Sequence, residues 1–349
     1  MVTSQGLDLD DLLRAVVQKL RDGRPHVLLV GFPVPARVAE PPCRMHWAAI
    51  LLPTLSSGDR TAAGFRPQEA GYWQRDRCEI LHNAAAITWL PTANWDDEDL
   101  TARGRLPAVL RERRICLLGA GALGAQVAEL LVRGGVRDLV VIDPDRLQAG
   151  NLARHTLLLT QLEQPKADAL AERLNAISPH ARVRAVCASF PALSADAQNL
   201  VRACDLIIDC TADDAVLTHL SQEVAASAHR LFVSFSLGYQ AERLFCFAAA
   251  GATFPLTAFR FREFIDPWLR NERDNTHDVP WPCDGIGCWH PLFPARADDV
   301  TMMATCALKE LVQVASQHLA APSFVVYAQH YEDGVYHGVR RLAGEDARG

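Results

Sequence analysis

The sequence predicts an α/β protein in which a nucleotide-binding domain with a mixed sheet follows a small α+β module. A strand-like run at 115–118 enters the glycine-rich segment 119–124, a helical pattern follows, and a second strand-like run at 139–142 ends at Asp143. A glycine-x-glycine-x-x-glycine loop between a strand and a helix lets backbone N–H groups and the positive helix end approach phosphates. An acid about 20 residues after the loop is placed to bind a ribose hydroxyl. The pattern predicts a Rossmann-like unit without selecting the nucleotide.

Length and composition limit the number of domains and the kinds of partner that the chain can have. At 349 residues and 49% hydrophobic content, the chain can hold two domains with a sizeable core. Its net charge of −6 argues against nonspecific nucleic-acid binding, and no apolar run reaches the length of a membrane span. The ten cysteines are scattered and several lie inside strand-like apolar runs, which is typical of buried thiols in a reducing compartment and not of a disulfide framework. We therefore expect a cytoplasmic protein that binds neither nucleic acid nor membrane.

The N-terminal part, residues 1–105, is predicted to be a small α+β module. Apolar spacing predicts an amphipathic helix over 8–20, and the polar, glycine-containing stretch 56–77 predicts a surface loop. Apolar runs predict three strands, at 26–30, 45–52 and 87–90. We find no catalytic constellation in this part, and we assign residues 106–349 to the nucleotide domain.

The polar residues after Asp143 point to the chemistry of the site. Asp145, Asn151, Arg154 and Lys166 follow within the segments 143–145, 151–155 and 164–169. A nicotinamide enzyme has no need of these groups, but an enzyme that cleaves ATP between the α and β phosphates must hold and neutralise a triphosphate. That need makes Arg154 and Lys166 the catalytic cations and gives Asn151 a positioning role. Asp145 is either a second nucleotide contact or an ordinary turn aspartate.

These motifs resemble those of the ThiF/MoeB and ubiquitin-activating-enzyme superfamily, over roughly residues 113–310. The resemblance implies a Rossmann-like ThiF/MoeB-type adenylation domain with ATP and Mg²⁺ as cofactors. The implied reaction is ATP-dependent adenylation of the C-terminal carboxylate of a ubiquitin-like protein. His155 stands where the family has glutamine, so that contact is changed or lost. The residues expected to bind the nucleotide are Gly119, Gly121, Gly124, Asp143, Asp145, Asn151, Arg154 and Lys166.

The resemblance also implies a magnesium ligand and an arginine that reaches another subunit. The strand-like run 205–210 leads into Asp213 and Asp214, and the family's later acid at this point binds magnesium. We choose Asp213, with Asp214 as the alternative, while Asp209 binds the metal or caps the strand end. Arg105 is the candidate for the family's upstream arginine, the alternative being a solvated basic face on a connector.

A cysteine-bearing loop is expected at about 271–294. The family carries a cysteine before its final long helix; Cys283 matches that placement best and Cys288 is its rival. A thiol there can attack an acyl-adenylate and form a thioester. A zinc site lacks a second cysteine pair, a disulfide is disfavoured by the expected compartment, and a purely structural loop stays open.

The resemblance implies partners as well. We expect a ubiquitin-like or sulfur-carrier protein substrate, a conjugating enzyme and a homodimer; bacterial relatives of this kind include some that act in antiviral defence. The alternatives are a sulfur-carrier or peptide adenylyltransferase of the same superfamily, a non-catalytic scaffold subunit of a heterodimeric activating enzyme, and an NAD-dependent oxidoreductase.

Overall fold

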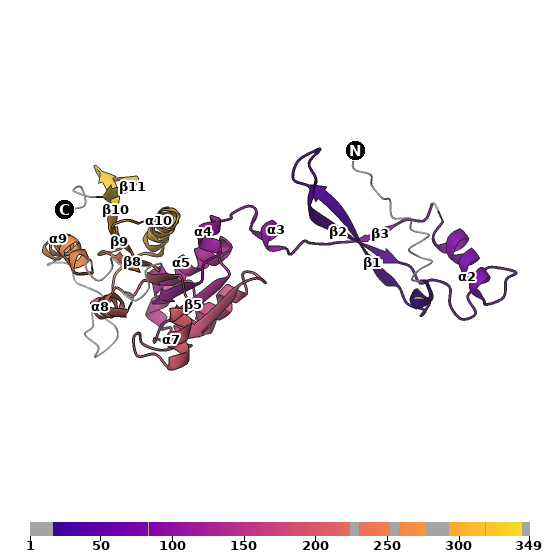
Figure 1. Cartoon of the computed structure of the whole chain (residues 1–349), viewed down its shortest axis with the longest axis horizontal. Coiled ribbons are helices and arrows are strands. Elements are labelled where there is room, and N and C mark those ends of the chain that lie inside the picture. Colours follow the sequence, from indigo (N-terminus) through magenta and orange to yellow (C-terminus); the bar gives the residue numbers. More distant parts are fainter. Residues whose placement is uncertain are drawn as a thin grey trace. The chain divides into compact units, whose positions relative to one another are not determined.

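The computed structural model describes residues 17–82, 84–223, 230–251, 258–276, 293–317 and 319–343. The chain divides into two compact units, residues 1–99 and 100–349 (Figure 1). Most of the predicted helix at 8–20, and both Cys283 and Cys288, lie outside the described residues.

The N-terminal unit is built on a three-stranded antiparallel sheet in the order β1-β2-β3. Its strands are β1 (His26–Pro35), β2 (Pro42–Leu52) and β3 (Thr88–Leu90). The three predicted strands are confirmed, and the first two are longer than expected because β1 and β2 stay paired from His26↔Leu52 to Pro35↔Pro42.

The predicted surface loop at 56–77 is wrong in its second half. That half forms the helix α2 (Glu69–Arg75), which continues into the π-helical turn η1 (Asp76–Ile80). The Asp76 carboxylate is buried and accepts the Ser56 backbone N–H at 2.7 Å. This long-range anchor fixes the helix, and the local polarity of the sequence does not indicate it.

The C-terminal unit contains an eight-stranded mixed sheet in the order β11-β10-β9-β8-β7-β4-β5-β6, which confirms the predicted α/β fold. The parallel strands are β4 (Ile115–Leu118), β5 (Asp138–Ile142), β6 (Arg182–Val186), β7 (Leu206–Asp209) and β8 (Leu231–Leu237). The antiparallel strands are β9 (Arg243–Ala250), β10 (Ser323–Glu332) and β11 (Val335–Ala343).

Helices cover both faces of this sheet (Figure 1). One hydrophobic cluster joins the sheet to α5 (Ala122–Arg133), α6 (Lys166–Asn175) and α10 (Ala297–Ser316). A second joins it to α7 (Ala195–Arg202) and α8 (Asp214–Glu223). The remaining helices and turns are α3 (Asp97–Thr101), α4 (Ala108–Arg111), η2 (Ala149–Ala153), η3 (Leu159–Gln161) and α9 (Ala258–Thr276). Among the described residues, no helix has the length and apolar character needed to cross a membrane.

The parallel pairing determines where the polar loops gather. Strands β4, β5, β7 and β8 run in the same direction, so their carboxyl ends lie at one edge of the sheet. The loops that follow them, beginning at Gly119, Asp143, Cys210 and Gly238, start from this edge. Ligands of open α/β sheets bind at the carboxyl ends of the strands, so the candidate site is expected here.

Candidate functional site

The glycine-rich loop turns sharply between β4 and α5. Gly119 has φ +87°, and a Cβ on it would come within 2.9 Å of the Cys210 backbone. A Cβ on Gly124 would collide with the Gly119 carbonyl. Among the described residues outside its own chain neighbours, nothing lies within 4 Å of the position that a Cβ on Gly121 would take. Two of the glycines are therefore required by packing of the chain, whereas the third leaves open space for a bound molecule.

Asp143 holds this loop to the loop after β5. Its Oδ2 accepts the Ala120 backbone N–H at 2.6 Å, and its Oδ1 accepts the Asp145 backbone N–H at 2.8 Å. The carboxyl is buried, and burial raises its pKa against the opposing effect of these hydrogen bonds and of Lys166. The predicted ribose acid is thus also the residue that fixes the shape of the site.

Lys166 begins α6 and pairs with the other predicted acid. Its Nζ lies 2.9 Å from Oδ2 of Asp145, and its backbone N–H donates to the Asp145 carbonyl at 2.8 Å. The Lys166 side chain is 10% exposed, whereas that of Asp145 is 64% exposed. A largely buried ammonium whose carboxylate partner stands in solvent has capacity for a second anion.

Arg154 is carried by the turn η2. Asn151 supports that turn, because its Oδ1 accepts the Gln148 N–H at 3.0 Å and its carbonyl accepts the Arg154 N–H at 3.1 Å. The Arg154 guanidinium is half-buried and lies 6.0 Å from the centre of the Phe293 ring, and burial lowers its pKa. Within the described parts of the chain it has no carboxylate partner. A partly desolvated cation without a counterion is a strong candidate for binding a phosphate or carboxylate.

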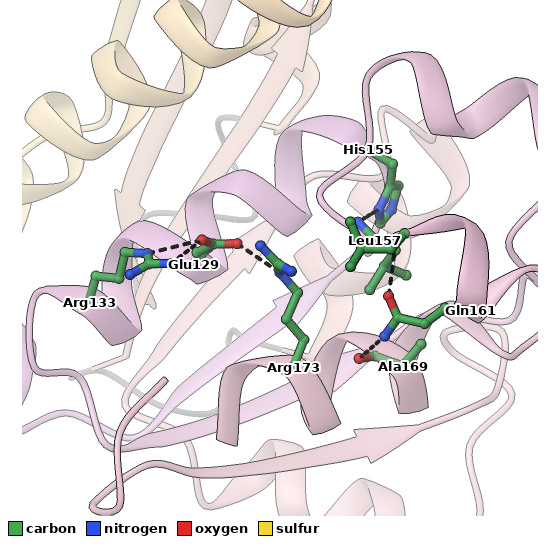
Figure 2. Close-up of polar contacts among 8 residues, drawn as sticks. Glu129, Arg133, His155, Leu157, Gln161, Ala169 and Arg173 are labelled. Atoms are coloured by element: carbon green, nitrogen blue, oxygen red, sulfur yellow. Dashed lines mark hydrogen bonds and ion pairs between the residues drawn. The ribbon is translucent and has the colours of Figure 1, made fainter. Parts of the chain in front are cut away.

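His155 replaces the glutamine of the family pattern and ties the Arg154 turn to the glycine-rich loop. Its Nδ1 accepts the Leu157 N–H at 3.1 Å, so its Nε2 carries the hydrogen and donates to the Ala120 carbonyl at 2.7 Å. Burial lowers the pKa of the imidazole, which favours this neutral tautomer. Figure 2 shows His155 above Leu157, with Gln161 bonded to the Ala169 carbonyl beside them. The substitution therefore supplies a contact that braces the loop.

An ion-pair cluster holds together the two helices that begin at the site. Glu129 on α5 lies 2.8 Å from Arg133 and 3.0 Å from Arg173 on α6 (Figure 2). Because α5 begins after the glycine-rich loop and α6 begins at Lys166, this cluster helps to fix their separation.

Two adjoining cavities lie at the carboxyl edge of the sheet. The first, about 310 Å³, is lined by residues that include Asp143, Asp145, Lys166, Phe190 and Asp213. The second, about 360 Å³, is lined by residues that include Arg154, Phe235, Leu237, Phe293 and Val300. Gly121, Cys210 and Thr211 line both. The two predicted cations thus lie on different cavities that meet at the glycine-rich loop.

The candidate metal ligands occupy different environments. Asp209 is buried and accepts hydrogen bonds from the Thr211 hydroxyl at 2.6 Å and the Ser234 hydroxyl at 2.9 Å. It lines neither cavity, and the geometry favours its role as a cap on the strand end. Asp213 lines the first cavity, and its Oδ1 accepts the Ala215 N–H at 2.7 Å. Asp214, the first residue of α8, lines neither cavity. No group of three metal-binding side chains occurs among the described residues.

One predicted residue lies outside the two cavities, and two residues that were not predicted line the first cavity. Arg105 is exposed on the connector before α4 and lines neither cavity. Sequence reasoning missed Ser189 and Phe190, which line the first cavity from the loop after β6. The available signal was their position in the loop after a parallel strand, at the edge of the sheet where ligands of such folds bind.

Comparisons with known proteins give the family. Residues 105–321 match the model of the ThiF family, and residues 1–95 match that of the Cap2 central linker domain. The chain is 39% identical over 317 residues to an ATP-dependent ubiquitin transferase-like protein Cap2 from Enterobacter hormaechei subsp. hoffmannii, covering 89% of this chain and 51% of that protein. It is 32% identical over 113 residues to a molybdopterin-synthase adenylyltransferase from Escherichia coli K12, covering 32% of this chain and 45% of that protein.

The same comparisons extend to solved structures. A crystal structure of E. coli MccB with ATP aligns with a TM-score of 0.47 at 12% identity, covering 67% of this chain and 65% of that one. The chain spans about half the length of the curated relatives it matches. The ThiF model alone accounts for more than half of the chain, and it covers the glycine-rich loop, Arg154 and Lys166. The chain belongs to the ThiF family.

Proposed function

We propose that this protein uses ATP to adenylate the C-terminal carboxylate of a ubiquitin-like or sulfur-carrier protein. The observation that carries the proposal is the pair of cavities that meet at Gly121, with Lys166 on one and Arg154, which has no carboxylate partner among the described residues, on the other. Relatives named as an ATP-dependent ubiquitin transferase-like protein and as a molybdopterin-synthase adenylyltransferase support the same chemistry.

Each cavity suits one reactant. The first has the Asp143 carboxylate and the Lys166 ammonium, so we assign it to ATP. The second is mainly apolar, with Arg154 as its cation, so we assign it to the end of the protein substrate. A carboxylate oxygen from the second cavity would attack the α-phosphorus near Gly121. The bond from that phosphorus to the β-phosphate oxygen would break, and pyrophosphate would leave.

The chain's own groups would lower the barrier mainly by positioning and charge. Lys166 is fixed by Asp145 and Arg154 by its turn, so little rearrangement is needed when negative charge moves to pyrophosphate. Asp143 and His155 hold the Ala120 backbone from both sides, its N–H and its carbonyl. These two are positioning residues for the loop.

The donor set fits a magnesium ion shared with phosphate. Magnesium is commonly held by one or two carboxylates plus phosphate oxygens and water, and Asp213 offers a carboxylate on the first cavity. Asp213 would hold the ion, which would supply further neutralisation of the phosphate charge.

Further steps belong to the same proposal. The thiolate of Cys283 or Cys288 would attack the acyl-adenylate, the bond from the acyl carbon to the phosphate oxygen would break, and AMP would leave, which gives a thioester for a conjugating enzyme. A homodimer would let Arg105 reach the partner's triphosphate. The adenylation domain would comprise residues 106–349, with the N-terminal module of residues 1–105 serving partner recognition in bacterial ubiquitin-like conjugation and antiviral defence.

ATP–pyrophosphate exchange with magnesium tests the proposal, using the full chain and each candidate ubiquitin-like protein. Exchange that depends on one carrier and is lost in Lys166→Ala supports it. Lys309→Ala is the matched control, since Lys309 lies on α10 and lines neither cavity. ATP binding without exchange for any carrier would favour the scaffold alternative. Absence of ATP binding would overturn the proposal.

A further inference from the structure

The two cations of the site are held in different ways. Lys166 has a carboxylate partner, because its Nζ lies 2.9 Å from Oδ2 of Asp145. The Arg154 guanidinium is half-buried, and among the described residues it has neither a carboxylate partner nor a hydrogen-bond acceptor. Its central carbon lies over the ring of Phe293, 6.0 Å from the ring centre. A partly desolvated cation therefore faces an aromatic ring instead of an anion.

Phe293 reaches the second cavity from the part of the chain that leads into α10. Two residues later, Ala295 forms a parallel β-bridge with Gln240 in the turn between β8 and β9. On β10, the Gln329 side chain donates to Oδ1 of Asp299 on α10 at 2.9 Å and to the carbonyl of the residue after Gln240 at 3.3 Å. The segment that carries Phe293 is thus fastened to the antiparallel strands of the sheet.

Arg154 reaches the same cavity from the parallel part of the sheet, in the turn that follows β5. Its backbone N–H donates to the Asn151 carbonyl at 3.1 Å, and the next residue, His155, donates to the Ala120 carbonyl at 2.7 Å. Arg154 and Phe293 both line the second cavity. Their contact therefore joins two segments that are supported separately by the fold.

An aromatic face suits a cation that must stay available to another anion. A guanidinium has five N–H donors, and a carboxylate partner would occupy two of them and offset the charge. The negative face of a phenylalanine ring attracts the cation and replaces part of its lost hydration. Because the ring accepts no conventional hydrogen bond, the donors of Arg154 stay free for a phosphate or carboxylate.

We propose that Phe293 is a positioning residue for the reaction, holding the Arg154 guanidinium through the face of its ring. This inference rests on the proposed function and specifies how its second cation is kept in place. Phe293 acts through Arg154, which keeps its charge and its donors for the anion beside Gly121. Lys166 does not need such a ring, since Asp145 fixes it.

Fluorinated phenylalanines at position 293 test this role at nearly constant side-chain shape. Each added fluorine withdraws negative charge from the ring face, which weakens its attraction for a cation. In pyrophosphate exchange with the carrier identified above, kcat should fall stepwise from phenylalanine to its mono-, di- and trifluorinated forms. The total loss should be roughly two- to thirtyfold, the range of a cation–π contact, with the KM for ATP unchanged. The same kcat throughout the series would overturn the proposal.

A double-mutant cycle tests whether the ring acts through the arginine. Phe293→Leu should lower kcat roughly two- to thirtyfold when Arg154 is present and should have no further effect in Arg154→Ala. Phe293→Tyr keeps the aromatic ring and should retain kcat. Val300→Ala is the matched control, since Val300 lines the same cavity from α10. Its effect should be the same with and without Arg154.

The outcomes separate this inference from the proposed function. If Phe293→Leu lowers kcat by the same factor in both backgrounds, the ring acts by packing alone, which would overturn the positioning role and leave adenylation standing. No exchange with any carrier would remove both. A stepwise loss along the fluorinated series supports the positioning role even if Phe293→Leu fails to fold.

Discussion

The two hydrogen bonds of Asp143 allow a sharp test of how the site is held. Both oxygens accept backbone N–H groups, from Ala120 at 2.6 Å and from Asp145 at 2.8 Å. In Asp143→Asn one oxygen becomes an NH₂ group, so whichever way the amide lies, a donor faces a donor. One hydrogen bond to a charged group is lost, which costs roughly 1.5–3 kcal/mol. The neutral amide does not carry the cost of burying a charge, which offsets part of this loss. We therefore expect the free energy of unfolding to fall by about 2 kcal/mol.

For a unit of this size, that loss should lower the melting temperature by about 4–8 °C. Asp205→Asn is the matched control. Asp205 accepts the Arg114 N–H at 3.1 Å, but its side chain is 52% exposed and its amide form can turn its oxygen to that donor. Thermal melts of both variants, with and without ATP, make the comparison. Equal melting temperatures for the two variants, with unchanged ATP affinity, would refute the assignment of Asp143 as the brace of the loop.

Three further predictions concern other residues. Arg154→Ala should lower the kcat of pyrophosphate exchange by about 10²-fold or more with little change in ATP affinity, because Arg154 lines the second cavity. Arg184 lies on the exposed side of β6, so an equal loss of kcat in Arg184→Ala would contradict this prediction. His155 has a lowered pKa, so its contribution to stability is complete above its unfolded pKa of about 6.5 and is lost as pH falls through the folded pKa. Melting temperatures between pH 5 and 8 should show less pH dependence in His155→Gln than in the unmodified protein. Glu310 is buried, and its carboxylate accepts hydrogen bonds from Arg341 at 3.0 Å and from Tyr327 at 2.8 Å. Glu310→Ala should lower the free energy of unfolding by about 2 kcal/mol, a figure already reduced because Arg341 is partly exposed. Exchange kinetics should be retained at low temperature.

Local patterns in the sequence predicted much of the C-terminal unit. Strands such as 115–118 and 139–142 are short continuous apolar runs, which is typical of parallel strands buried on both faces. Helix α2 was missed, because its anchor is a hydrogen bond between Asp76 and Ser56, which are far apart in the sequence. Phe190 and Leu237 were missed as cavity residues, because nothing in their own neighbourhoods marks them as polar or catalytic.

The sequence by itself determined the glycine-rich loop, the acid after β5 and the two cations, because each belongs to a motif whose spacing is local. Only the tertiary structure decided that Lys166 and Arg154 line different cavities and that Asp209 accepts hydrogen bonds from Thr211 and Ser234. It also decided that β8 extends beyond the end of β7. These features depend on which strands become neighbours. Strand β7 enters between β4 and β8, and that insertion places Cys210 and Thr211 where the two cavities meet. Residue spacing within one segment carries no information about such pairing.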